Sequence, residues 1–254
     1  MSNPIKGAWY LITGLKLIFK PGIRGYVALP LTINMVIFAA LIWFGAQQFG
    51  AFMDWLIPEL PQWLQWLKWI LWFVFAVAGL LILFFSFSLL ANLVSSPFNG
   101  LLAEAVEVHL TGQKPPGDSS GFIKSIIPSM VHELKKTGYF IAWSVPFLLL
   151  FLIPGVNLAA PLLWFIFSAW MLALEYTDYP MGNHHIEFAK QRRTVGSKRF
   201  LNLGFGSAVS VATMTPFVNF LVMPAAVAGA TALWIDQLKG IDQLKGIEQL
   251  KEGN

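Results

Sequence analysis

The chain has 254 residues, of which 56% are hydrophobic and 12% charged, with a formal net charge of +4 at pH 7. Because soluble domains carry about 25% charged residues, this composition excludes an ordinary soluble domain and indicates an integral membrane protein. Cysteine is absent, which excludes disulfides, thiol catalysis and thiolate metal sites, and the mild positive charge is weak evidence for a nucleic-acid partner, so none is expected.

The N-terminal residues 1–20 contain a predicted amphipathic helix. Its apolar residues recur at spacings of three and four, which places them on one stripe: Ile5, Ala8, Trp9, Ile12, Leu15 and Phe19. Such a helix can lie in the membrane interface, or it can pack its stripe on the protein's own core. The sequence leaves both interpretations open.

Two segments are predicted to cross the membrane. The first, residues 22–46, begins after the break at Pro21 and Gly22, and the second, residues 69–94, contains no charged residue. A crossing needs about 20 apolar residues, so both segments are long enough.

Two polar segments, 95–138 and 175–203, separate the remaining apolar stretches. Pro97 is expected to open a new helix in the first of them, because proline suits a first helical turn. Both segments contain clusters of lysine or arginine, and the positive-inside rule therefore places them and both termini in the cytoplasm.

Two further apolar stretches, 139–174 and 204–234, are each divided by a similar turn. The first turn has Pro154 and Asn157, and the second has Pro216 and Asn219. The legs are roughly 13–18 residues long, short of the about 20 that a crossing needs. We therefore predict re-entrant hairpins rather than additional thin crossings. Repeated broken helices in a membrane protein point to a transport path.

The predicted fold is thus an all-α integral membrane protein with two long transmembrane helices, two re-entrant hairpins and a cytoplasmic helical head, all within residues 1–234. Residues 235–254 hold a hexamer repeat, whose copies begin at Ile235, Ile241 and Ile247. A three-residue apolar spacing drifts around a helix and forms no seam. The repeat is therefore interpreted as a soluble, loosely ordered tail.

The strongest candidate for a binding site is the turn formed by Gly22, Ile23, Arg24 and Gly25. Free N–H groups at a helix N-terminus attract anions, and glycine allows an anion to approach the backbone. Arginine adds a fork of donors that suits tetrahedral oxyanions. The alternative is a plain membrane-flanking turn with an arginine on the cytoplasmic side.

Other polar residues are interpreted as structural or pore-lining, namely Glu104, Glu107, Asp178 and Asn183. The adjacent His184 and His185 point to different helix faces, so they do not form a metal pair. No motif of metal-ligand spacing supports a metal site, and no cofactor and no enzymatic activity is predicted.

Several segments together resemble the CysZ-type sulfate permease family, and their order and spacing fit that family along nearly the whole chain, up to about residue 234. They are Gly22 to Arg24, Ser96 to Glu104, Glu107, Leu110 to Gly112, Tyr176 to Pro180, Asn183 and His184. The resemblance implies a multi-pass protein of the bacterial inner membrane that admits sulfate for cysteine biosynthesis. It also implies sulfate binding at the Gly22 turn and homo-oligomers whose subunits can lie antiparallel in the bilayer. Gly25 stands where this family often has a second arginine, a role that Lys20 or Lys16 could partly fill.

Two other functions remain open at this point. One is a membrane scaffold or accessory protein without transport activity of its own. The other is a membrane-embedded enzyme that uses Glu175, Asp178 and His184. Sulfate flux through the purified protein separates the permease from both.

Overall fold

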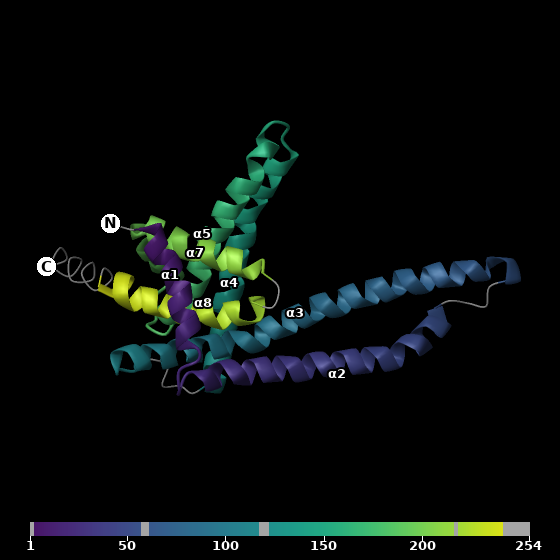
Figure 1. Cartoon of the computed structure of the whole chain (residues 1–254), viewed down its shortest axis with the longest axis horizontal. Helices are drawn as coiled ribbons and strands as arrows, with labels where there is room; N and C mark the ends of the chain where they lie inside the picture. The colour runs from purple at the N-terminus through teal and green to yellow at the C-terminus, as the bar shows by residue number, and fades with distance from the viewer. Residues whose placement is uncertain (1–2, 57–60, 117–121, 216–217, 241–254) are drawn as a thin grey trace. The chain divides into compact units, whose positions relative to one another are not determined.

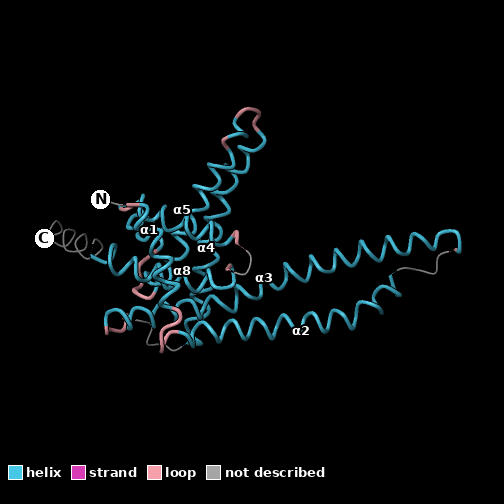
Figure 2. Tube along the Cα trace, in the orientation of Figure 1, coloured by secondary structure: helices cyan, strands magenta, loops and turns pink. Residues whose placement is uncertain are grey.

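The computed structural model describes residues 3–56, 61–116, 122–215 and 218–240. Within these ranges the secondary structure is helical and contains no strand (Figure 2). The chain divides into two compact units. We call Ala28–Ser96 the long-helix unit, and Met1–Val27 together with Pro97–Asn254 the packed unit. Two helices, α2 (Arg24–Leu56) and α3 (Gln65–Thr111), contribute to both units.

The long-helix unit consists of the apolar parts of α2 and α3, with the short helix η1 (Gln62–Leu64) before α3. Arg24–Met53 and Gln62–Ile82 are long and apolar enough to cross a membrane. In the most apolar window of Arg24–Met53 only 11% of the residues are buried, and in that of Gln62–Ile82 none is buried. The Phe49 and Trp72 rings meet edge to face, with centroids 4.8 Å apart. Because so little of these two apolar windows is buried within the described chain, a bilayer is the environment that suits them.

The new helix that we expected to open at Pro97 is not separate. The structure continues α3 through this proline to Thr111, and the helix ends at Gly112, whose φ is +72°. Proline removes one backbone donor, which membrane helices tolerate, and the residues on either side favour a helix. The expectation of a break was therefore wrong.

The packed unit is built around α1 (Pro4–Leu17), α7 (Arg199–Thr213) and α8 (Asn219–Leu233), which pack on one another (Figure 1). Asn3 caps α1 by accepting a hydrogen bond from the Ile5 N–H at 2.9 Å. Glycines lie where these helices meet. A Cβ added at Gly7 would lie 2.9 Å from the Phe205 nitrogen, and one added at Gly14 would lie 2.8 Å from the Gly229 Cα. Backbones that approach so closely are typical of helix packing in membranes.

The orientation of α1 decides between the two interpretations of its apolar stripe. The buried face holds Gly7, Tyr10, Gly14 and Leu17. The predicted stripe lies outside, with Ile5, Trp9 and Phe19 between 58% and 66% exposed. The helix does pack on the core, but through its glycine face, and the stripe stays uncovered.

The first predicted hairpin is formed by α4 (Phe122–Leu149) and α5 (Ala160–Gly182), which lie side by side (Figure 1). The short helices η2 (Leu150–Leu152) and η3 (Val156–Leu158) flank the turn, where Gly155 has a φ of +84°. Phe147 stacks on Phe167 across the two legs, with ring centroids 4.4 Å apart. How deeply this hairpin enters a membrane remains a prediction.

The second hairpin follows α6 (Phe188–Ser197) and consists of α7 and α8. Its turn includes Pro216 and Phe217, which lie outside the described residues. Ala160–Gly182 and Leu221–Leu238 are also long and apolar enough to cross a membrane, which gives four candidate spans among the described residues. The most apolar windows of Ala160–Gly182 and Leu221–Leu238 are 39% and 72% buried, so protein covers these two helices far more than α2 and α3.

The chain does not leave the packed unit at residue 234. A π-helical turn, η4 (Trp234–Leu238), extends α8, and the helix continues through Gly240. Trp234 and Leu238 are buried. The described part of the first repeat copy is therefore packed, whereas residues 241–254, which hold the other two copies, lie outside the described residues.

Candidate functional site

The Gly22 turn joins α1 to α2 and has a defined local geometry. The Lys20 carbonyl oxygen accepts hydrogen bonds from the N–H groups of Ile23 and Arg24, both at 3.1 Å. Gly22 has a φ of +87°, a conformation that glycine adopts at little cost. Ile23 is 1% exposed and anchors the turn, whereas Arg24 and Gly25, the first two residues of α2, are exposed. The turn therefore presents an arginine beside a helix N-terminus, as the sequence predicts.

A cavity of about 290 Å³ lies beside this turn, within the packed unit. Gly22 and Ile23 line it on one side, and Glu104, His109 and Lys114 contribute from α3 and the residues that follow it. Arg24 and Gly25 are not among its lining residues. The structure thus brings Gly22 and Ile23 of the predicted anion turn together with Glu104, a residue predicted to be structural or pore-lining.

The charges around this cavity are mixed. Lys114 Nζ lies 3.8 Å from Glu104 Oε1, and the Lys114 side chain is 80% exposed. A pair this exposed contributes less than about 1 kcal/mol, so Lys114 can leave its partner at little cost. The sequence predicts His109, like Glu104 and Glu107, as a solvated or intersubunit group, and it gives no signal for Lys114, because only the fold places these two residues beside Gly22.

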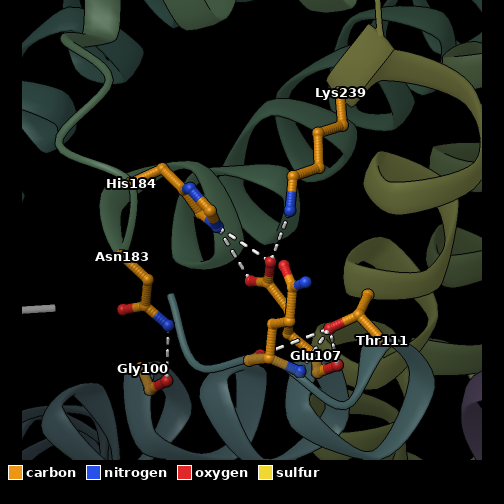
Figure 3. Close-up of polar contacts among 7 residues, drawn as sticks. Gly100, Glu107, Thr111, Asn183, His184 and Lys239 are labelled. Atoms are coloured by element: carbon orange, nitrogen blue, oxygen red, sulfur yellow. Dashed lines mark hydrogen bonds and ion pairs between the residues drawn. The ribbon is translucent and has the colours of Figure 1, made fainter. Parts of the chain in front are cut away.

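A buried polar cluster lies elsewhere in the packed unit, around Glu107 (Figure 3). The Glu107 residue is 1% exposed. Its Oε1 lies 2.9 Å from both His184 Nε2 and Lys239 Nζ, and its Oε2 lies 3.0 Å from His184 Nε2. Next to it, Asn183 Nδ2 donates to the Gly100 carbonyl oxygen at 2.9 Å. Because a buried carboxylate is costly unless paired, these partners hold α3 against the end of α5.

Asp178 belongs to a second buried cluster, which joins α4 to α5. The Lys136 side chain is 1% exposed, and its Nζ lies 3.0 Å from Asp178 Oδ2 and 3.1 Å from Glu175 Oε1. The same Nζ lies 5.4 Å from the centroid of the Tyr179 ring. Asp178 and Glu175 therefore serve to fix the base of the first hairpin.

Four of the predicted polar residues thus fall at three places. Glu104 lines the cavity, Glu107 and Asn183 share a contact region between α3 and α5, and Asp178 lies in the α4–α5 cluster. Among the described residues, no group of three or more His, Cys, Asp or Glu side chains could hold a metal ion. Sequence reasoning missed Lys136 and Lys239 as partners because neither spacing nor local pattern indicates them.

Comparison with known proteins places these features in a family. The family model described as "Sulfate transporter CysZ/Etoposide-induced protein 2.4" matches residues 10–224. A protein from Pseudomonas aeruginosa strain PAO1, named Sulfate transporter CysZ, is 43% identical over 233 residues, which cover 91% of this chain and 95% of that protein. A protein of the same name from Pseudomonas fluorescens strain Pf-5 is 46% identical, with coverages of 91% and 94%. The residues matched by the family model include the Gly22 turn, Glu104, Glu107, Asp178 and His184, but not Lys239.

Proposed function

The chain belongs to the sulfate transporter CysZ/etoposide-induced protein 2.4 family, and we propose on this basis that it admits sulfate across the bacterial inner membrane for cysteine biosynthesis. The observation that carries the proposal is the 43% identity to a protein named as a sulfate transporter, over nearly the full length of both chains. The names of these relatives point to transport rather than catalysis. The uncovered apolar helices α2 and α3 supply the membrane anchorage that such a role needs.

In this proposal α2 and α3 cross the bilayer, and the α4–α5 and α7–α8 hairpins enter it only partly. Two observations support this arrangement: the turn at Gly155 contains no charged residue, and protein covers α5 and α8 more than α2 and α3. The polar segments 95–138 and 175–203 form the cytoplasmic head. The uncovered stripe of α1 lies in the interface, where lipid covers Ile5, Trp9 and Phe19.

Gly22, Ile23, Arg24 and Gly25 form the site that receives sulfate. An isolated charge costs tens of kcal/mol to bury in a medium of low dielectric, so a dianion needs a wet path lined by donors. The N-terminus of α2 and the exposed Arg24 guanidinium supply such donors. The adjoining cavity adds Lys114, whose weak hold on Glu104 leaves it available to the anion. Binding of moderate strength lets sulfate enter and leave.

Uptake of radiolabelled sulfate into proteoliposomes that hold only this protein tests the proposal. Arg24→Ala is expected to lower uptake at limiting sulfate by about tenfold to a hundredfold, because a charged hydrogen bond contributes about 1.5–3 kcal/mol. Arg193→Ala, which removes an exposed arginine from α6, is the matched control and is expected to keep full uptake. Undiminished uptake in Arg24→Ala would reject the site. No uptake by folded wild-type protein would reject the permease and favour a scaffold without transport activity.

We further propose that the protein acts as a homo-oligomer, in which subunits can lie antiparallel. The support is the family resemblance together with the uncovered helices α2 and α3, which offer apolar surface to a neighbour as well as to lipid. Native mass spectrometry from detergent gives the subunit number. A monomer that transports sulfate at the wild-type rate would contradict this.

A further inference from the structure

The cavity beside the Gly22 turn has two walls that belong to different helices. One wall comes from the turn between α1 and α2 and from the start of α2. The other comes from one face of α3, with Leu101, Glu104, Ala105 and Val108 among its residues. Because these walls lie far apart in the sequence, the width of the cavity depends on what holds α3 in place relative to α1.

Another face of the same stretch of α3 carries contacts that hold this helix. Glu107 follows Glu104 by three positions and is 1% exposed. It pairs with His184, which follows α5, and with Lys239, which follows η4. Figure 3 shows these two side chains reaching Glu107 from different elements. Since Glu104 and Glu107 lie within one turn of the same helix, a movement of Glu107 carries Glu104 with it.

Lys239 is in turn fixed relative to α1. The π-helical turn η4 continues α8, and α1 packs closely on α8, where a Cβ added at Gly14 would lie 2.8 Å from the Gly229 Cα. Within η4, Asp236 Oδ2 accepts a hydrogen bond from the Tyr10 hydroxyl of α1 at 3.1 Å. A series of direct contacts therefore runs from α1 through α8 and η4 to Lys239, and from there to α3.

The surroundings of Lys239 support a specific role for this side chain. It directly follows η4, and π-helical turns are rare and occur frequently at functional sites. Its Nζ lies 2.9 Å from Glu107 Oε1 and 5.0 Å from the centroid of the Trp234 ring. The Glu107 side chain is 2% exposed, and loss of one partner of a buried charge is strongly destabilising. Removal of the lysine is therefore expected to displace this carboxylate and the helix that carries it.

We propose that Lys239 is a positioning residue for the cavity that receives sulfate. By pairing with Glu107 it holds the α3 wall, which includes Glu104, at its distance from the Gly22 turn. Lys239 is not among the residues that line the cavity, so it acts on sulfate through α3. The effect on sulfate rests on the proposed function, whereas the effect on the cavity does not.

Equilibrium binding of sulfate to the full-length protein in detergent is the first test. Lys239→Ala is expected to weaken binding by about fivefold, within the range for substitutions that alter a ligand site without touching the ligand. Lys239→Arg keeps a cation beside Glu107 and is expected to stay within about twofold of wild type. Gln237→Ala is the matched control, because it removes a hydrogen bond of the same segment to Lys198, which does not line the cavity. This control is expected to keep wild-type affinity.

A second control separates positioning from a general loss of stability. Lys136 lies in the buried cluster that joins α4 to α5 and does not line the cavity. Lys136→Ala is expected to destabilise the protein, but its folded fraction is expected to bind sulfate as wild type does. If Lys136→Ala weakened binding as much as Lys239→Ala, the effect would be a general one and the proposal would be wrong.

The separation of the two walls can also be measured without sulfate. Because the chain contains no cysteine, introduced cysteines can be spin-labelled without background. Tyr26→Cys and His109→Cys together place labels on exposed residues that line the cavity from α2 and from α3. Dipolar broadening of the electron paramagnetic resonance spectrum reports how close the labels are. Lys239→Ala is expected to change this broadening, and Lys239→Arg is expected to keep it.

Either measurement can overturn the proposal. It is wrong if folded Lys239→Ala binds sulfate with wild-type affinity, or if the labels keep the wild-type broadening in that variant. If Lys239→Ala does not fold, Lys239→Gln takes its place, because glutamine removes the charge but keeps a donor for Glu107. If the wild-type protein binds no sulfate, the proposed function fails, and the label measurement still decides whether Lys239 positions the α3 wall.

Discussion

Gly14→Ala is the substitution whose effect the structure defines most sharply. Gly14 lies on the buried face of α1, where its backbone meets α8. An added Cβ would lie 2.5 Å from the Gly229 nitrogen and 2.8 Å from the Gly229 Cα, and closer still to the Ala225 carbonyl oxygen. All three atoms belong to the backbone of α8, so no side chain can turn aside to make room.

The expected cost follows from the movement required. Ordinary contact begins at 3.4 Å, so relief at the Gly229 Cα alone needs a shift of 3.4 − 2.8 = 0.6 Å, and relief at the Ala225 oxygen needs more. Overpacking costs about 1–3 kcal/mol, and occasionally more. Alanine recovers up to about 1 kcal/mol through its helix propensity, so we expect a net loss of about 2 kcal/mol from a severe clash of this kind.

Gly138→Ala is the matched control. Gly138 lies within α4, and an added Cβ would meet no heavy atom within 4 Å. Only the propensity gain applies, so this variant is expected to be as stable as wild type or up to about 1 kcal/mol more stable. Equilibrium unfolding of both variants in detergent, followed by circular dichroism, gives the comparison. If Gly14→Ala proved as stable as Gly138→Ala, the close packing of α1 on α8 would be refuted.

Three further predictions concern charge and titration. Lys136→Ala is expected to destabilise the protein by about 3 kcal/mol, because it removes the cation that Asp178 and Glu175 share. Lys136→Arg keeps a cation there and is expected to keep most of the stability. Unfolding measurements on the two variants give the comparison. Burial, followed by the nearby Asp236 carboxylate, raises the pKa of Tyr10 to about 12, so folding favours the neutral phenol. The stability that this preference contributes is present below pH 10 and is lost as pH rises toward 12, and Tyr10→Phe is expected to lack this step in a pH series of unfolding curves. Lys114→Ala is expected to weaken sulfate binding by less than about fivefold, because the Lys114 side chain and its pair with Glu104 are exposed. Equilibrium binding of sulfate measures the effect. A larger loss of affinity in Lys114→Ala than in Arg24→Ala would reverse our ranking of the two cations.

The elements that the sequence predicts well are those controlled by local composition. The uncharged stretch at 69–94 lies within α3, and the turn between α4 and α5 falls at Pro154 and Asn157 as predicted. Gly22 adopts a positive φ at the predicted break. Each of these features depends on residues within a few positions of one another, so hydropathy, proline and glycine suffice to place them.

Predictions that concerned contacts were less complete. The apolar stripe of α1 suggested which face could be covered, but the helix packs through Gly7 and Gly14. Apolar periodicity measures the transfer of side chains from water, whereas this contact depends on how closely two backbones can approach. The residues around Pro97 likewise contain a helix-start pattern, yet α3 continues through them because helical residues flank the proline on both sides.

The sequence by itself determined the class of protein, its two long apolar helices, the Gly22 turn and the family to which it belongs, because each follows from composition or from short runs of residues. Only the tertiary structure decided that Glu107 pairs with His184 and with Lys239, which is 132 positions away, and that Lys136 pairs with Asp178. A buried charge must find an opposite charge wherever the fold brings one, and sequence distance carries no information about that partner. For this reason the repeat, which the sequence suggests is a loose tail, supplies in its first copy a lysine to one of the most buried carboxylates in the described chain.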